Sequence, residues 1–250
     1  MRKYLNATTI TWALLHVILV LIGILVINID YTTNALGSEI STGLGVSIMA
    51  AGVVGIFLFL YVALLDTTRS RLQALSDAGL DGIFRHRSVR IKGEYDARLA
   101  QAKRIDVVGY GLGSMLEDFS NEFARWSRQA KVRIVAINPD APTKESSYAD
   151  MRDKEEGREA GKTRSDVQRL IKSIKENEDI NKDHFELRLM NSIPSVNIMI
   201  IDEEIFWGPY LLAEQSRNTF TMTVRKGGFM FKALDNHFSQ IWDNHSAPPP

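Results

Sequence analysis

The chain has 250 residues, and its 30 Lys and Arg balance its 30 Asp and Glu, so the formal net charge is zero. General nucleic-acid binders usually carry a basic excess, so this balance argues against direct binding of naked nucleic acid. The sequence contains no cysteine, which excludes disulfide scaffolds, cysteine-based zinc sites and thiol catalysis.

Two long uncharged segments open the chain. Residues 4–29 and 40–65 contain no Asp, Glu, Lys or Arg. A hydrocarbon core of roughly 30 Å needs about 20 apolar helical residues, so both segments are long enough to cross a membrane. The first is too long for the apolar region of a signal peptide, and no small-residue cleavage site follows it. The sequence therefore predicts a membrane-spanning α-helical hairpin over residues 1–66.

Basic residues predict the direction of this hairpin. Arg2 and Lys3 precede the first span, Arg69 and Arg71 follow the second, and the loop at 30–39 has no basic residue. Under the positive-inside rule both ends of the chain lie in the cytoplasm and the loop lies outside. Everything after the second span is then expected to be cytosolic.

Small residues at Ser47, Ala51 and Gly55 form a stripe along the second span. Such stripes let helix backbones approach closely in lipid, which predicts either association between chains or packing of the two spans of one chain. His16 lies inside the first span, one turn after Trp12. It is interpreted either as a neutral, hydrogen-bonded side chain or as a functional group within the membrane.

The rest of the chain is polar enough to fold in water. Residues 67–103 are expected to form a helical stalk and linker, 104–246 one α/β domain, and 247–250 a disordered tail. Within the domain, a buried strand at 105–108 is followed by a helix that begins with a capping box, Ser114 with Glu117. A second strand follows the helix, and this order is typical of a parallel βαβ unit.

Four further strands and a last helix complete the expected domain. The charged segment 144–179 precedes them and is interpreted as a solvated loop and helix surface, or as a binding insert. The expected strands and helix lie at 185–190, 196–202, 204–207, 220–224 and 231–241.

A glycine-rich turn joins the first strand of the domain to its helix. Gly109, Gly111 and Gly113 stand in the sequence GYGLGSM. Backbone amides at such a turn can bind a phosphate, but the spacing departs from G-x-G-x-x-G, so an ordinary turn is the alternative.

The segment SVNIMIIDEEIFWGPY resembles the H-x-K-x4-D motif of the phospholipase D family. Ser195 stands where the family has His, Asn197 where it has Lys, and Asp202 where it has Asp; Gly208 lies near the family's Gly-Ser turn. The resemblance covers about residues 79–244 and implies a phospholipase-D-like mixed sheet flanked by helices. Because two such motifs meet in the family and this chain has one, it also implies a homodimer or higher oligomer.

The groups that perform that family's chemistry are missing here. Ser195 has no partner base nearby and Asn197 carries no positive charge, so neither an activated nucleophile nor a phosphate-stabilising cation stands at the matching positions. We therefore expect no catalytic residue, no metal and no cofactor. Ser195 and Asn197 remain candidates for ligand or partner binding, or for polar residues at a strand edge. Asp202 is a candidate ligand group or a turn cap, and Tyr210 stacks on a ligand or packs in the core.

The architecture of two N-terminal spans and a compact cytosolic domain resembles two-transmembrane effectors of bacterial antiphage systems, of the retron-associated and cyclic-nucleotide-activated types. This implies an inner-membrane protein in which the cytosolic domain senses a reverse transcriptase–nucleic acid complex or a cyclic nucleotide and the spans disrupt the membrane. Two alternatives remain open: a membrane-anchored phospholipase-D-like phosphodiesterase and a non-toxic membrane scaffold.

Overall fold

The computed structural model describes residues 7–28, 34, 37–85 and 89–250. The chain divides into two compact units, Met1–Gln73 and Ala74–Pro250. Arg2, Lys3 and most of the loop at 30–39 lie outside the described residues, so the orientation of the hairpin stays a prediction.

The first unit is built from two apolar helices, α1 (Ala7–Asn28) and the greater part of α3 (Ser38–Ala78). Their segments Thr11–Asn28 and Ser38–Val62 have mean hydropathies of 2.4 and 2.3 and are long and apolar enough to cross a membrane. A hydrogen bond from Ser41 Oγ to the Val26 carbonyl, at 2.7 Å, joins the two helices. These residues therefore form a helical hairpin, as the uncharged segments predicted.

A glycine ends the long helix α3. Gly79 has a φ of +75°, in the left-handed region that favours glycine, and its amide donates to the Ser76 carbonyl at 2.8 Å. A Cβ on Gly79 would lie 2.7 Å from the Arg225 carbonyl oxygen. The position therefore tolerates no side chain, and the chain can enter the sheet directly after the helix.

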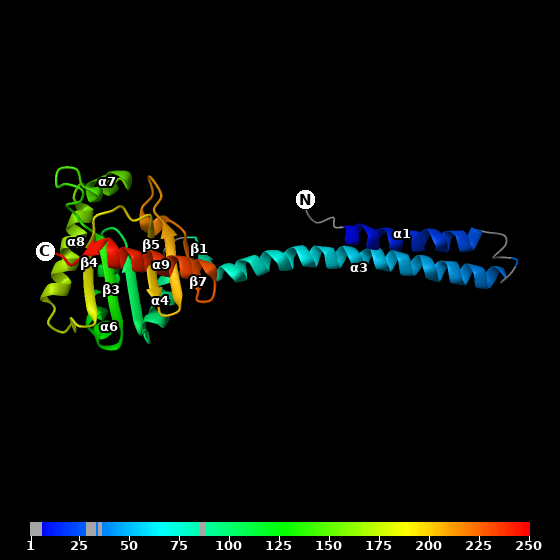
Figure 1. Ribbon diagram of the computed structural model, residues 1–250, viewed down its shortest axis with the longest axis horizontal. Helices are drawn as coiled ribbons and strands as arrows, with labels where there is room; N and C mark the ends of the chain where they lie inside the picture. Colours follow the sequence, from blue (N-terminus) through cyan, green and yellow to red (C-terminus); the bar gives the residue numbers. More distant parts are fainter. Residues whose placement is uncertain (1–6, 29–33, 35–36, 86–88) are drawn as a thin grey trace. The chain divides into compact units, whose positions relative to one another are not determined.

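The second unit is an α/β fold around one eight-stranded mixed sheet, shown in Figure 1. The strand order is β1-β7-β6-β5-β2-β3-β4-β8; β2, β3 and β4 run parallel and the other neighbours are antiparallel. The elements are β1 (Leu80–Phe84), α4 (Val89–Leu99), β2 (Arg104–Val108), α5 (Gly113–Phe119), η1 (Ser120–Glu122), α6 (Phe123–Gln129), β3 (Lys131–Ile137), α7 (Tyr148–Glu155), α8 (Lys162–Glu176), β4 (Phe185–Met190), β5 (Val196–Ile201), β6 (Glu204–Pro209), η2 (Ser216–Asn218), β7 (Thr221–Arg225), α9 (Phe229–Asn244) and β8 (Ser246–Ala247).

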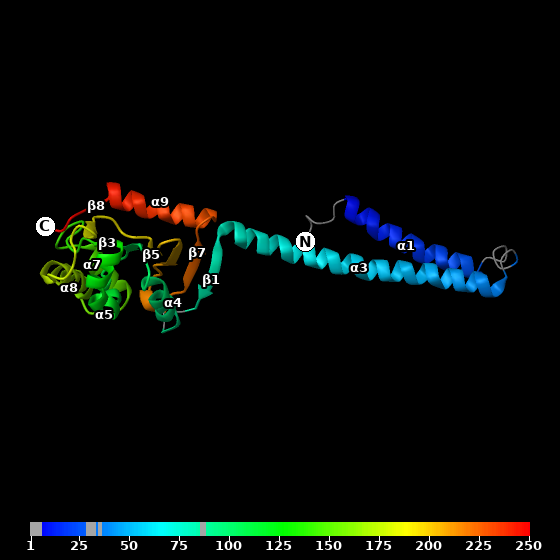
Figure 2. The same cartoon turned by 90° about the horizontal axis from the view of Figure 1, so that it is seen from below.

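Helices cover both faces of this sheet. Helix α9 packs on one face, where its buried Phe238 and Ile241 meet side chains of the sheet such as Val135 and Ile200. The helices α4 to α8 contribute to the core on the other face. Figure 2, seen from below, shows α4 and α5 on the side of the sheet opposite α9. The expected parallel pairing across the βαβ unit is confirmed, because β2 and β3 pair in parallel from Arg104↔Lys131 onward.

Three expectations about local structure were wrong. Ser114 is not a helix cap: α5 begins at Gly113 and its N-cap is Leu112, with no side-chain hydrogen bond. The single helix expected after it is divided by the 3-10 turn η1. The segment expected as a linker contributes the edge strand β1, which pairs with β7, because the alternation of half-buried Leu80, Gly82 and Phe84 suits an edge strand.

The end of the chain also differs from expectation. Ser246–Ala247 form the short strand β8, which pairs with Leu189 and Met190 of β4, so Ala247 is ordered although 247–250 was expected to be a disordered tail. The Ser246 hydroxyl donates to the Trp242 carbonyl at 3.1 Å, which turns the chain from α9 back onto the sheet.

Candidate functional site

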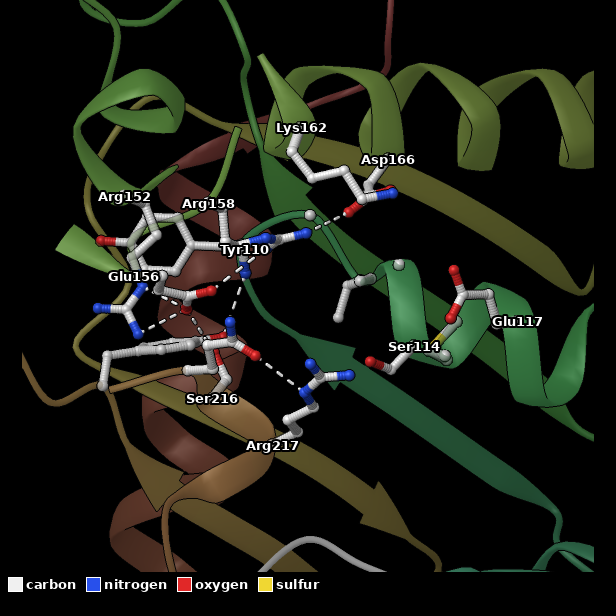
Figure 3. A pocket seen from close by; sticks show the side chains of 16 residues that line it. Tyr110, Ser114, Glu117, Arg152, Glu156, Arg158, Lys162, Asp166, Ser216 and Arg217 are labelled. Carbon is white, nitrogen blue, oxygen red and sulfur yellow. Dashed lines mark hydrogen bonds and ion pairs between the residues drawn. The ribbon is translucent and has the colours of Figure 1, made fainter. Parts of the chain in front are cut away.

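A cavity of about 250 Å³ lies in the second unit, where the parallel strand β2 ends. In open α/β sheets, ligands commonly bind beyond the carboxyl ends of the strands. Three segments far apart in sequence surround the cavity, and Figure 3 shows their side chains pointing toward one another. They are the turn after β2 with the first residues of α5 (110–117), the helices α7 and α8 with the loop between them, and the connection from β6 to β7.

The glycines of the first segment allow the turn to pack closely against α8. A Cβ on Gly113 would lie 2.6 Å from Asp166 Oδ2, and one on Gly111 would lie 3.2 Å from the Asp166 Cβ. Between them, Leu112 has a φ of 53°. A carboxylate therefore already lies against this turn, and the glycines serve close packing between the turn and α8.

Two buried carboxylates line the cavity: Glu156 forms ion pairs with two cations and Asp166 with three. The side chains of Glu156 and Asp166 are only 4% and 2% exposed. Arg158 links them, at 3.3 Å from Glu156 Oε2 and 2.9 Å from Asp166 Oδ2, and Lys162 lies 2.9 Å from Asp166 Oδ1. Because buried charges are costly unless they are paired, this network fixes the wall made by α7 and α8.

Arg152 holds the third segment against the others. Its guanidinium lies beside a pair of aromatic rings, 5.5 Å from the centre of Tyr110 and 5.1 Å from that of Tyr210, and its side chain is 2% exposed. Its guanidinium donates to the carbonyls of Leu211 at 3.1 Å and Glu214 at 3.0 Å. Burial raises the pKa of the Tyr110 phenol, although the Arg152 charge opposes this.

The connection from β6 to β7 contributes polar groups to the cavity. Ser216 Oγ donates to Glu156 Oε1 at 3.0 Å, and Arg217 Nε donates to Gln215 Oε1 at 2.9 Å. Among the described residues, no carboxylate forms an ion pair with Arg217. The lining has four cations and three carboxylates: Arg152, Arg158, Lys162 and Arg217 against Glu117, Glu156 and Asp166. The cavity therefore has an excess of one positive charge.

Some residues singled out from the sequence meet at this cavity. Tyr210, Gly111 and Ser114 line it. Gly109 lies beside it, since a Cβ there would be 3.0 Å from the Tyr210 hydroxyl. The Tyr210 hydroxyl in turn accepts a hydrogen bond from the Tyr110 amide at 3.2 Å.

The motif positions that resemble phospholipase D do not line the cavity. The Asn197 side-chain amide is buried and donates to the Gly208 carbonyl at 2.9 Å, across the β5–β6 pair. Ser195 is exposed and lies just before β5, and its carbonyl accepts from the Tyr210 amide at 3.4 Å. Asp202 lies in the β5–β6 turn with a φ of 51°, and its Oδ1 accepts from the amides of Lys103 and Arg104 at 2.8 Å each. The Asp202 carboxylate therefore binds the backbone where β2 begins and, within the described part of the chain, does not cap its own turn.

Sequence reasoning missed most of the charged residues of the cavity. Arg152, Glu156, Arg158, Lys162 and Asp166 all belong to the charged segment 144–179, for which a solvated surface and a binding insert were the two interpretations, and none of the five was singled out. Two features of the sequence mark the helices that carry them. Ser147 caps α7 by accepting from the Asp150 amide, and oppositely charged residues stand four apart at 152 and 156 and at 162 and 166. Neither feature shows that the side chains turn inward.

In the hairpin, the predicted small-residue stripe is divided between two surroundings. A Cβ on Gly55 would lie 2.3 Å from His16 Nδ1, so Gly55 packs inside the hairpin against α1. Ser47 and Ala51 are exposed, and the Ser47 hydroxyl donates to the Gly43 carbonyl at 2.8 Å. His16 Nδ1 is buried and has no hydrogen-bond partner among the described residues.

Among the described residues there is no group of three His, Asp or Glu that could hold a metal ion. No protein-family model matches the chain, and no curated protein sequence matches it either. A solved structure that it resembles is that of TrmBL2, an archaeal chromatin protein described as showing a novel mode of DNA binding. The two share 14% identity over 81% of this chain and 69% of that chain, with a TM-score of 0.41.

Proposed function

We propose that this protein is a bacterial inner-membrane effector, in which a catalytically inactive phospholipase-D-like domain in the cytoplasm senses a trigger and the hairpin disrupts the membrane. The observation that carries the proposal is the exposure of the hairpin. Only 6% of the segment Thr11–Asn28 and 11% of Ser38–Val62 are buried. Exposed apolar surface on this scale is unstable in water and calls for lipid or a protein partner.

The residues at the motif positions support the view that the domain does not hydrolyse phosphodiesters. Asn197 uses its amide to bond a neighbouring strand, and Ser195 replaces the nucleophilic His of the family. A sensing domain needs a place for its trigger, and the charged cavity at the end of β2 supplies one. A ligand there can shift an equilibrium between two states of the protein only through a difference in its affinity for them.

Two outer residues of the hairpin support association between chains. Ser47 and Ala51 are exposed on the outside of the hairpin and are small enough for close approach of another helix. Gly55, in contrast, is already used to pack α3 against His16. We therefore assign association between chains to the Ser47–Ala51 surface.

The test is controlled expression in bacteria, with growth and a membrane-potential dye as measurements. Expression of the wild-type chain is expected to depolarise the membrane and arrest growth. Ala51→Leu adds bulk to the outer surface and should relieve both effects, whereas Val53→Leu, at an exposed position about half a helical turn away, should not. A wild-type chain that integrates into membranes without depolarising them would instead support the scaffold.

The alternative function, a membrane-anchored phosphodiesterase, makes a different prediction for the same cells. Under it, Ser195→Ala and Asn197→Ala would each abolish both the toxicity and a measurable phosphodiesterase activity. The effector proposal predicts that Ser195→Ala is as toxic as the wild type, because the Ser195 side chain is exposed and does not line the cavity.

A further inference from the structure

We infer that the cavity at the end of β2 binds a small organic phosphate ester, with Arg217, Arg158 and Lys162 as the groups that meet the phosphate. The inference deepens the proposed function. It rests on that function only for the effect that binding has on the membrane.

Hydrogen-bond donors from all three walls meet at this cavity. Arg158 and Lys162 come from α8 and the loop before it, Ser216 and Arg217 come from the β6–β7 connection, and Ser114 comes from the first turn of α5. A phosphate group has several acceptor oxygens and no obligatory donor. Guanidinium groups match phosphate oxygens in a planar fork, and such charge-assisted bonds are stronger than neutral ones.

The carboxylates of the cavity do not oppose an anion, because cations already neutralise them. Asp166 is bonded by Arg158 and Lys162, and Glu156 is bonded by Arg158 and Arg152. Glu117 lies 3.9 Å from Arg169 and is 61% exposed, so solvent screens its charge. Arg217 is therefore the cation of the lining that a bound phosphate can neutralise at no loss of an existing ion pair within the described residues.

The aromatic side of the cavity suits the organic part of such a ligand. Tyr110 and Tyr210 both line it, with their ring centres 4.7 Å apart in an edge-to-face arrangement. The volume of about 250 Å³ is small for a ligand pocket and fits a compact molecule with one phosphate rather than a long chain.

The connection 211–218 is the part of the site that a ligand can stabilise. Arg152 holds it by two backbone carbonyls, and Glu156 holds it through Ser216. A phosphate between Arg217 and Arg158 would add a direct link between this connection and the α7–α8 wall. Ligand binding is therefore expected to stabilise the folded domain as well as to fill the cavity.

The test is calorimetric titration of the purified full-length protein in detergent at about 50 mM salt. The probes are AMP, cyclic AMP, ribose 5-phosphate and inorganic phosphate, with adenosine and ribose as uncharged controls. At least one phosphate ester is expected to bind at least about tenfold more tightly than its uncharged counterpart. Its affinity should fall as the salt is raised to about 200 mM, because exposed charges are screened over roughly 8–10 Å. The comparison of AMP, cyclic AMP and ribose 5-phosphate tells a nucleotide from a sugar phosphate.

Two variants test the assigned residues. Arg217→Gln should weaken binding at least about tenfold, and it is expected to fold because the side chain is exposed and donates to Gln215 alone among the bonds described. Lys162→Gln should weaken binding as well. The matched control is Arg125→Gln, which removes an exposed arginine paired with Glu122 on a different part of the surface and should leave the affinity unchanged.

The inference is overturned if no probe binds at about 1 mM, if adenosine and ribose bind as tightly as their phosphates, or if Arg217→Gln binds like the wild type. These failures are separate from a failure of the proposed function. Growth arrest without phosphate binding would overturn this inference alone, whereas phosphate binding without any effect on the membrane would overturn the effector function alone.

Discussion

The hairpin and the α/β domain place the same kinds of side chain in opposite surroundings. In the hairpin, Phe57 and Leu58 are 68% and 59% exposed, whereas in the domain Phe123 and Phe206 are at most 1% exposed. The domain hides its apolar side chains from water in a core, while the hairpin leaves them outside, where lipid is the matching solvent. The average composition therefore hides two units that place apolar side chains differently, one in a core and one on its surface. The same kind of substitution is expected to have a different effect in each unit.

The largest effect is expected when the core of the domain is emptied. Phe123 is fully buried against Trp126 and Phe185, so Phe123→Ala should lower the free energy of unfolding by about 3–5 kcal/mol, from lost burial and the cavity left behind. Phe229→Ala is the control, because Phe229 is 65% exposed and its loss should cost little. Urea unfolding in detergent, followed by tryptophan fluorescence, measures both. Equal destabilisation by the two variants would contradict the described core.

The hairpin should respond to charge instead of to lost volume. Val54 is 54% exposed in the middle of the second span, so Val54→Arg puts a charge into lipid and should oppose insertion by about 2.5–3.5 kcal/mol. Leu72→Arg is the control, since Leu72 is also exposed on α3 but lies beyond the span. Carbonate extraction of membranes measures the integrated fraction. If Val54→Arg remained fully integrated, the membrane assignment of this segment would be wrong.

The hairpin and the domain also differ in how well their structures could be predicted from the sequence. Two uncharged segments were enough to predict the two helices of the hairpin, because a helix that spans a membrane needs about 20 apolar residues and few or no charges. The strands β2 and β3 followed from buried apolar runs, and their parallel order from the helix between them. The strand β1 was missed because Gly82 reads as a break, and only pairing with β7 makes it a strand. Tertiary pairing overrides weak local preference here.

The cavity was the least predictable part of the molecule. Tyr210 and Gly111 were identified from a motif and a glycine turn, but Arg152 and Asp166 came from a segment whose charges suggested a solvated surface. Both are 2% exposed. Arg152 is buried against the distant carbonyls of Leu211 and Glu214, and Asp166 is buried against the glycine turn after β2. A sequence shows that opposite charges stand four residues apart on a helix, but not that the pair turns inward against a distant loop.

The cap of α7 links the fold to the cavity and predicts an effect of intermediate size. Ser147 is fully buried, and its hydroxyl accepts from the Asp150 amide at 3.1 Å at the start of the helix that carries Arg152. Ser147→Ala should lower the free energy of unfolding by about 0.5–2 kcal/mol. Ser165→Ala, on α8, is the control because that side chain caps no helix among the described elements. Urea unfolding measures the difference. If Ser147→Ala left the free energy of unfolding unchanged, the hydroxyl would not stabilise α7 as its cap.

The smallest effect is expected at an exposed ion pair of the domain, and it shows what burial adds to a charge. Lys226 Nζ lies 2.7 Å from Glu203 Oε1, but the two side chains are 63% and 69% exposed. Water and salt screen this pair, so Lys226→Gln should change the free energy of unfolding by less than about 1 kcal/mol. Lys162 makes a contact of similar length, 2.9 Å, with Asp166, whose side chain is 2% exposed. Lys162→Gln removes one of the cations from that buried carboxylate and should therefore destabilise the domain more than Lys226→Gln in the same urea titration. If the two variants lowered the free energy of unfolding equally, the charges of the cavity would behave like those of a solvated surface, which would contradict an electrostatic site for an anion there.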